Sequence, residues 1–257
     1  MAESAGVARP FVFAWHFLTA IPLSRVHHDP TAAELASSMA WYSTVGLLIG
    51  GLLVAVDQGL SLLFAPVVAN ALLIVLLVLV TRGLHQDGLA DTLDGLAGGK
   101  TPEDRLRIMR DPRVGALGAT GLFLSLLLRY AALMALPQPI WVPMLFCAPA
   151  LGRWAMVTLA LSMPYARSGG GLAAPFLQHL SLSHVLWSSL VLALALAAGL
   201  GFPIALATVT VGLALLGLLR QTFLRWFGGV TGDLLGATNE VVEILFLLLV
   251  PLMVPVR

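Results

Sequence analysis

Three aspartates, Asp87, Asp91 and Asp94, stand in a short polar segment, residues 83–95, of an otherwise very apolar chain. Their spacing of i, i+4 and i+7 places them within about 60° of one another on a helix. Three carboxylates on one stripe repel each other unless a cation lies between them. Mg²⁺ prefers oxygen ligands and commonly combines a few carboxylates with phosphate oxygens. The stripe therefore predicts metal-assisted chemistry on an anionic, phosphorylated substrate.

A solvated helix face is the simpler explanation of such a stripe, but the composition argues against it. Solvated faces usually mix in Lys or Glu, whereas this segment combines Asp with Gly88 and Gly95. Asp is a poor helix former, and glycines allow a substrate or another helix to approach the backbone closely. Since the segment follows directly on a hydrophobic run, we expect a binding site at a membrane surface.

A second group of acids lies near the start of the last hydrophobic run. Asp233 and Glu240 are spaced i, i+7, and Glu243 follows one turn later. A carboxylate at the centre of a bilayer costs about 2.5–3.5 kcal/mol on insertion scales. Glu240 and Glu243 should therefore face a wet cavity or a cation, and the group could complete a site with two acidic walls. The number of metal ions stays open.

Four arginines follow the aspartate segment, on a predicted helix that begins after Thr101. The guanidinium fork matches phosphate oxygens, so these side chains could clamp a phosphorylated substrate. We expect Arg113, together with Arg110, to bind phosphate. Anchoring at the membrane surface explains Arg105 and Arg107 more simply.

Two further arginines lie within predicted membrane spans. Arg153 stands in the middle of its run, so its side chain should point into the bundle and meet an anion or an acid. Arg129 is closer to the far face and can reach the membrane surface by snorkelling.

The segment around Tyr165 and Arg167, with three glycines at 169–171, suits a phosphate or a flat ring system. His85, beside the first aspartate, is a candidate base, although an isolated His next to an Asp is more often structural.

The composition indicates whether this chain lies in water or in a lipid bilayer. Of its 257 residues, 59% are hydrophobic and only 11% are charged, with a mean hydropathy of +0.94. Soluble domains carry about 25% charged residues, so this chain is expected to lie in a bilayer. One cysteine, Cys147, excludes a disulfide framework and a cysteine-rich metal site. A net charge of +1 gives no reason to expect nucleic acid.

The apolar runs predict a single all-α domain, residues 1–257, built as a polytopic membrane bundle. Several runs reach the ~20 residues that one crossing needs, and we count seven: 40–64, 66–81, 115–136, 140–163, 184–201, 202–219 and 241–256. Residues 11–23 are too short to cross and predict an interfacial or re-entrant helix rather than a cleaved signal peptide.

The charges predict the orientation of these spans. Connections near Ala65, Gln138 and Gly201 carry neither Lys nor Arg, whereas the opposite side collects Arg25, Arg82, Lys100, Arg105, Arg107, Arg110, Arg113, Arg167, Arg220 and Arg225. Positive charge gathers in cytoplasmic loops, so the aspartate segment should face the cytoplasm at the cell inner membrane. Three connections on that side are long enough to build a site: 82–114, 164–183 and 220–240.

Five segments resemble the cobalamin (5′-phosphate) synthase family, the adenosylcobinamide-GDP ribazoletransferases. In chain order they are residues 17–22 (FLTAIP), 83–95 (GLHQDGLADTLDG), 108–115 (IMRDPRVG), 164–167 (PYAR) and 228–237 (GGVTGDLLGA). The aspartate segment is the most specific, and the others add weight by occurring together. Gln86 and Pro112 depart from the family pattern without touching the acids.

The resemblance implies a late step of vitamin B12 biosynthesis with Mg²⁺ as cofactor. Adenosylcobinamide-GDP would receive α-ribazole or α-ribazole 5′-phosphate, and GMP would leave. Mg²⁺ on Asp87, Asp91 and Asp94 would bridge the diphosphate, and a ribazole hydroxyl would attack phosphorus. Substrate contacts would come from Arg110, Arg113, Arg153, Tyr165 and Arg167, and the attacking hydroxyl would lose its proton to His85, Asp233 or Glu240.

Two other functions compete with this one. CDP-alcohol phosphotransferases also cluster aspartates, but their pattern has Arg after Asp-Gly-x-x-Ala and closes with i+4 spacing, unlike Asp91 and Asp94 here. An ion-coupled transporter could use Glu240, Glu243 and Arg153 within the membrane. The preferred lower base, the phosphorylation state of the acceptor and any homo-oligomer stay open.

Overall fold

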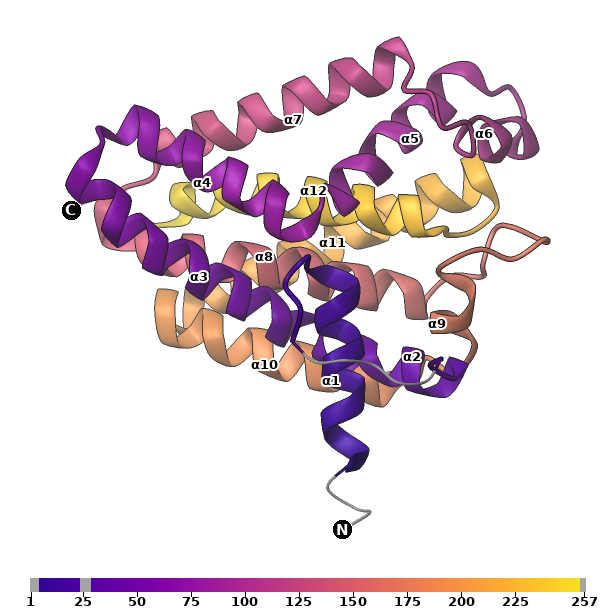
Figure 1. Ribbon diagram of the computed structural model, residues 1–257, viewed down its shortest axis with the longest axis horizontal. Coiled ribbons are helices and arrows are strands. Elements are labelled where there is room, and N and C mark those ends of the chain that lie inside the picture. The colour runs from indigo at the N-terminus through magenta and orange to yellow at the C-terminus, as the bar shows by residue number, and fades with distance from the viewer. Residues whose placement is uncertain (1–4, 24–28, 255–257) are drawn as a thin grey trace.

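The computed structural model describes residues 5–23 and 29–254, and Arg25 lies outside them. Within those ranges the chain is helical and contains no strand (Figure 1). The prediction of an all-α polytopic bundle is confirmed. The helices are α1 (Ala5–Leu18), α2 (Ala32–Ser38), η1 (Met39–Trp41), α3 (Tyr42–Leu63), α4 (Pro66–Thr81), α5 (Leu84–Gly98), α6 (Pro102–Ile108), α7 (Ala116–Ala135), α8 (Gln138–Leu161), α9 (Ala174–Gln178), α10 (Leu182–Leu200), α11 (Phe202–Phe227), α12 (Gly232–Leu249) and η2 (Val250–Met253).

Six helical segments of the described chain are long and apolar enough to cross a membrane, and a bent pair makes a seventh. The pair is α4 followed by α5, which turn by 88° at their junction. Arg82 and Gly83 both take left-handed backbone angles there, with φ of 55° and 64°. The Arg82 guanidinium donates a hydrogen bond of 2.9 Å to the His16 carbonyl of α1. The aspartate segment is therefore a helix that leaves the axis of its span.

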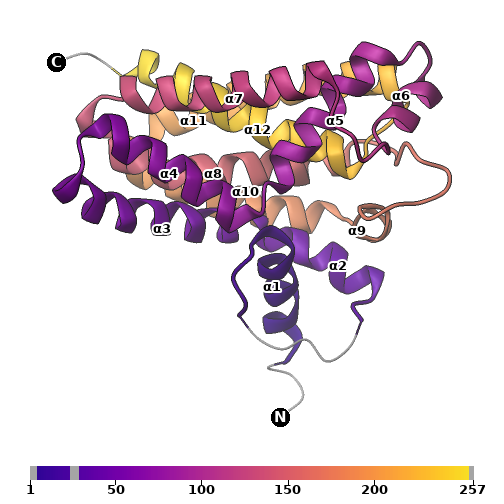
Figure 2. The same cartoon turned by 45° about the horizontal axis from the view of Figure 1, so that its top comes forward.

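The short helix predicted at residues 11–23 begins earlier and ends at Leu18. With 14 residues it reaches about 21 Å, less than the ~30 Å of a hydrocarbon core. It lies across the other helices rather than along them (Figures 1 and 2). The backbone N–H of Ala20 donates to the Val80 carbonyl of α4 over 2.6 Å, which ties the segment after α1 to the bundle.

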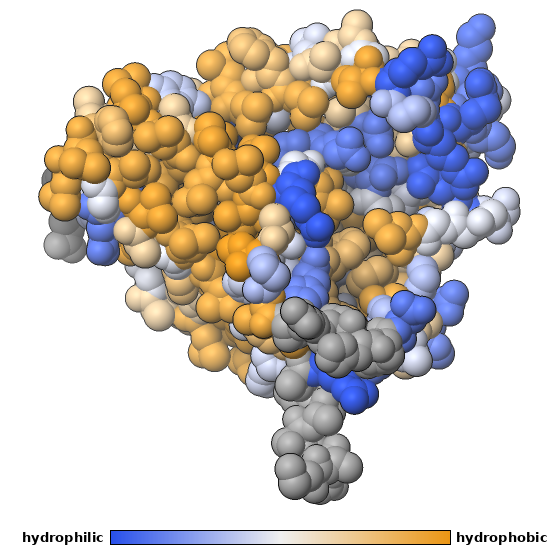
Figure 3. All heavy atoms as spheres, in the orientation of Figure 1, coloured by the Kyte–Doolittle hydropathy of each residue, from blue (hydrophilic) through white to orange (hydrophobic). Residues whose placement is uncertain are grey.

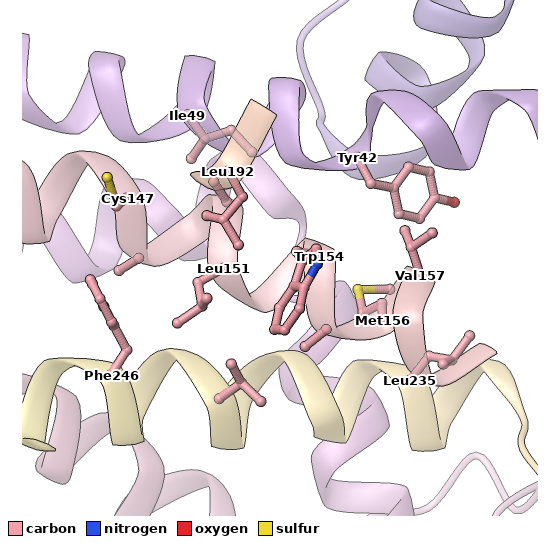
Figure 4. Packing of buried hydrophobic residues seen from close by; sticks show 14 of the residues in the cluster. Tyr42, Ile49, Cys147, Leu151, Trp154, Met156, Val157, Leu192, Leu235 and Phe246 are labelled. Carbon is pink, nitrogen blue, oxygen red and sulfur yellow. The ribbon is translucent and has the colours of Figure 1, made fainter. Parts of the chain in front are cut away.

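Helix α8 forms the centre of the bundle and is buried along most of its length. Figure 4 shows side chains of α8, such as Trp154, between α3 on one side and α12 on the other. Glycines allow the contact with α3, because a Cβ on Gly46 or Gly50 would collide with the backbone of Ala150 or Phe146. This close approach makes α3 and α8 one rigid unit.

Four charged side chains are buried in the middle of this bundle. Arg129 of α7 donates to Glu243 over 2.7 Å and to Glu240 over 2.9 Å, while Arg153 of α8 donates to Glu243 over 2.6 Å. Each of the four side chains is at most 3% exposed. Asn239 adds a hydrogen bond of 2.9 Å to Glu243. Two positive and two negative charges thus cancel within one network.

This network tests the predictions made for Arg153 and Arg129. Arg153 points into the bundle and meets an acid, as predicted. The expectation that Arg129 snorkels is wrong, because its side chain is buried and its guanidinium is paired with Glu240 and Glu243 of α12.

Polar residues gather at one end of the molecule. Figure 3 shows hydrophilic residues around α5 and α6, whereas the surface over α3 and α4 is hydrophobic. The turns between α3 and α4 and between α7 and α8 lie at the opposite end (Figure 1). These turns are the arginine-free connections near Ala65 and Gln138.

We predict that Gly50→Val destabilises the protein strongly, because the new side chain would meet the Phe146 carbonyl oxygen. Overpacking of a tight core typically costs about 1–3 kcal/mol, and backbone contact leaves little room for relief. A thiol-reactive dye that labels the buried Cys147 on heating would measure the Tm in detergent. Gly59→Val, in the same helix but with nothing within 4 Å, should leave the Tm unchanged; equal Tm values for both variants would refute the argument.

Arg153→Met should lower the free energy of unfolding by about 3–5 kcal/mol, because Glu243 loses one of its buried partners. The same dye assay measures the change. Arg107→Met removes an exposed pair with Asp104 and should have no measurable effect. A wild-type Tm for Arg153→Met would show that the ion pair between Arg153 and Glu243 does not stabilise the protein.

Candidate functional site

A cavity of about 150 Å³ lies at the polar end of the bundle. Five of its lining residues are candidates that the sequence selected: His85, Asp87, Tyr165, Arg167 and Asp233. The remaining lining residues are aliphatic, aromatic, methionine or glycine: Phe17, Met39, Tyr42, Leu84, Met156, Leu172, Ala173, Phe176, Leu177, Gly232, Leu235 and Gly236. Segments that are far apart in the chain therefore converge on one site.

Glycines bring the two acidic segments together. A Cβ on Gly88 of α5 would lie 2.6 Å from the Asp233 carbonyl oxygen of α12, and one on Gly236 would lie 3.3 Å from the His85 backbone. At this separation Asp87 and Asp233 line the same cavity. Asp91 lies near enough to both for their charges to act on its carboxylate. The predicted two acidic walls thus meet through Asp233.

A short backbone bridge positions Arg167. Residues 165 and 230 pair in parallel, with Ala166 N–H donating to the Val230 carbonyl and Val230 N–H to the Pro164 carbonyl, each over 2.9 Å. The bridge holds the segment after α8 against the turn before α12. From there the Arg167 guanidinium reaches the Asp233 carboxylate at 2.7 Å.

Three polar atoms of the cavity-lining residues have no hydrogen-bond partner in the described protein. They are His85 Nε2, Tyr165 Oη and Arg167 Nε, all buried. Buried polar groups are almost always bonded, because an unsatisfied one costs about 1–3 kcal/mol. Three around one cavity indicate a site that a polar ligand completes.

Asp94 differs from the other two aspartates of the stripe. Its carboxylate accepts hydrogen bonds from the backbone N–H groups of Gly115 and Gly118, at 2.7 and 2.8 Å. These N–H groups lie at the start of α7, where the backbone offers them no acceptor within the helix and a negative charge is favourable. Asp94 therefore joins α5 to α7, and its role as a metal ligand stays a prediction.

Among the described residues, no three His, Cys, Asp or Glu side chains are arranged to hold one metal ion. Mg²⁺ needs fewer protein ligands when a substrate supplies phosphate oxygens, since one or two carboxylates are then usual. Asp87 lines the cavity, and Asp91 follows it by one turn of the same helix, so their oxygen donors fit that requirement. Mg²⁺ as a cofactor stays a prediction, and Asp87 and Asp91 are the residues of the stripe that would hold it.

The two arginines that we expected to clamp phosphate are not among the residues that line the cavity. Arg110 is exposed, and the Arg113 side chain is 87% exposed and bonded to Asp111 at 2.9 and 2.7 Å. The hydrogen bonds from Arg113 lower the pKa of Asp111 to about 2. Arg167 is the arginine that the fold brings to the cavity.

Three other candidates have structural partners. Arg153 and Glu240 belong to the buried charge network and do not line the cavity. Arg105, which we interpreted as a membrane anchor, is buried; it donates to the Trp226 carbonyl over 3.1 Å and stacks 4.5 Å from that indole ring. That interpretation of Arg105 is wrong, because stacking on Trp226 removes its side chain from the surface.

Sequence reasoning missed the aromatic side of the cavity. Phe17, Tyr42 and Phe176 come from α1, α3 and α9, which no periodicity links. Phe17 lies in the segment 17–22 and Phe176 in the connection 164–183, but neither ring was a candidate site residue. The available signal was the position of Phe17 as the first residue of the segment 17–22.

Comparison with known proteins identifies the family of this chain. A family model described as cobalamin-5-phosphate synthase matches residues 10–251. Proteins named adenosylcobinamide-GDP ribazoletransferase are similar along most of the chain: 38% identical in Syntrophobacter fumaroxidans (90% of this chain, 96% of that protein), 37% in Chlorobaculum tepidum (90% and 91%) and 38% in Roseiflexus sp. (98% and 92%). No solved structure matches the chain. With the family model covering nearly all of it, this chain belongs to the cobalamin-5-phosphate synthase family.

Proposed function

We propose that this membrane protein is an adenosylcobinamide-GDP ribazoletransferase of cobalamin biosynthesis. It joins adenosylcobinamide-GDP to α-ribazole, or to α-ribazole 5′-phosphate, and releases GMP. The names of its relatives support this assignment. The observation that carries it is the cavity where Asp87, Asp233, Arg167, Tyr165 and His85 meet, with three of their polar atoms unpartnered.

The reaction is a phosphoryl transfer. A ribazole hydroxyl forms a bond to the phosphorus that carries the corrinoid arm, and the bond from that phosphorus to the oxygen of GMP breaks. Arg167 holds a non-bridging oxygen, for which its guanidinium exchanges part of its contact with Asp233. His85, whose Nε2 is unpartnered, or Asp233 accepts the proton of the hydroxyl.

Asp87 and Asp91 would hold Mg²⁺ at this site. When bound, the ion neutralises negative charge that develops on the departing phosphate. Asp94 would steady the stripe through its bonds to the start of α7. Glu240 is an unsuitable base, because it is paired with Arg129 away from the cavity.

We also propose that the cavity opens to the cytoplasm at the cell inner membrane. The support is the distribution of Lys and Arg, which are absent from three connections and concentrated in the others. The nucleotide substrate would then reach the cavity from the compartment in which nucleotides are made.

The charged residues that suggested a transporter form ion pairs inside the bundle. Glu240, Glu243 and Arg153 are paired within the described bundle, and the space beside them is only about 20 Å³, roughly one water molecule. Incubation of the purified protein with adenosylcobinamide-GDP, α-ribazole and Mg²⁺ tests the proposed activity directly. Release of GMP with formation of a cobalamin supports it, and turnover of a CDP-alcohol instead would refute it.

Asp91→Asn should lower turnover by orders of magnitude while the protein still inserts into the membrane, because the stripe loses the charge that attracts the cation. Chelation of Mg²⁺ should abolish GMP release reversibly. Asp57→Asn is the matched control. The Asp57 carboxylate accepts a 2.7 Å hydrogen bond from the Trp141 indole, and Asp57 does not line the cavity. Near-normal turnover of Asp91→Asn would exclude a metal role for Asp91.

Arg167→Gln should lower kcat/KM about 100-fold, as expected for the loss of one charged donor to a transferring phosphate. Arg113→Gln should change it little, because Arg113 is exposed and does not line the cavity. The comparison uses steady-state GMP release, with the Tm of each variant as a check on folding. The opposite order of effects would restore Arg113 as the phosphate clamp.

A further inference from the structure

The cavity has two chemically different walls. Asp87, Asp233 and Arg167 form a charged wall on α5, α12 and the segment after α8. Phe17, Tyr42 and Phe176, on α1, α3 and α9, form what we call the aromatic wall. In Figure 1 α5 lies above α12, whereas α1 and α9 lie below it. A ligand that fills this cavity must therefore carry both a charged or polar part and an apolar part.

The aromatic wall is a continuous cluster of rings. The Phe17 ring centroid lies 4.8 Å from that of Phe176 and 6.2 Å from that of Tyr42, with an interplanar angle of 15° to Tyr42. Leu172, which is 72% exposed, also lines the cavity. A flat apolar ring that entered would bury this leucine and stack against the phenylalanines.

The chemistry of the proposed substrates selects one ring. The corrinoid macrocycle is too large for a cavity of about 150 Å³. Guanine carries several hydrogen-bond donors and acceptors along its edges, which Phe17 and Phe176 cannot satisfy. The acceptor nucleoside carries a benzimidazole, a flat bicyclic base with mostly apolar edges, and it is small enough to enter.

We propose that the aromatic wall, with Phe176 and Phe17 at its centre, binds the base of the acceptor nucleoside. This inference rests on the proposed function and adds the acceptor subsite to it. Stacked there, the base directs its ribose toward the charged wall, where the attacking hydroxyl meets Asp233 and His85. The unpartnered Tyr165 Oη lies in the same cavity and supplies a hydrogen bond to the nucleoside.

The segment 168–173 shapes the entrance to this subsite. A Cβ on Gly171 would collide with the Tyr165 hydroxyl, so the absence of a side chain lets the segment lie directly on that tyrosine. Leu172 follows at once and reaches the cavity. The chain thus places one apolar side chain at the rim beside one polar group.

Equilibrium binding of α-ribazole to the full-length protein in nanodiscs, without donor or Mg²⁺, tests the subsite independently of turnover. Phe176→Ala should weaken α-ribazole binding about tenfold, the usual size of a base–aromatic stacking effect, and leave GDP binding unchanged. Phe123→Ala, on α7 with a side chain that is 65% exposed, is the control. Weaker GDP binding with unchanged α-ribazole binding would overturn the proposal and assign the wall to guanine.

Because Phe176 is buried and packs on Phe17, a second variant guards against loss of folding. Leu172→Ser changes an exposed side chain and should raise the KM for α-ribazole several-fold without changing the KM for adenosylcobinamide-GDP. It should also reduce the preference for a benzimidazole over an adenine nucleoside. A change in the KM of the donor alone would refute the subsite.

The two proposals fail in different ways. Absence of GMP release by the wild type, with α-ribazole still bound through Phe176, would reject the transferase assignment and keep the aromatic subsite. Normal GMP release, with α-ribazole binding insensitive to Phe176 and Leu172, would reject the subsite and keep the transferase.

Discussion

The register of α12 relative to α5 controls the geometry of the whole site. Two glycines, Gly88 and Gly236, let these helices approach until backbone meets backbone. Deeper in the bundle, Glu240 and Glu243 fix α12 to α7 and α8 through Arg129 and Arg153. Uncompensated charges in an apolar interior are costly, so a shift of α12 by one turn would break every pair at once. The buried ion pairs thereby fix the position of α12, and with it the position of Asp233.

The remaining parts of the cavity are attached to this frame by hydrogen bonds to backbone carbonyl groups. The pairing of residues 165 and 230 holds Arg167 beside Asp233. On the other side, α1 is fastened to the α4–α5 junction by Arg82 and by Ala20. The charged wall thus belongs to the interior of the bundle, whereas the aromatic wall includes the peripheral helices α1 and α9.

Much of the fold could be predicted from the sequence because hydrophobic runs and charge-free turns are local signals. The same holds for the aspartate stripe, since helical spacing places its members without knowledge of other helices. The partner of Arg129 could not be predicted, because it depends on which face of α7 meets α12. The capping of α7 by Asp94 depends on contacts between segments that are distant in the chain, and so does the aromatic wall. A single sequence does not show such contacts.

Helix α4 has 16 residues and rises about 24 Å, several ångströms less than a typical hydrocarbon layer. A lipid bilayer answers such a mismatch by thinning locally or by admitting the flanking residues below its surface. Either response would bring the junction at Arg82, and α5 after it, to the level of the lipid headgroups. An indented patch of membrane beside α5 would let a ligand with both apolar and charged parts reach the cavity from the lipid and from water at the same place.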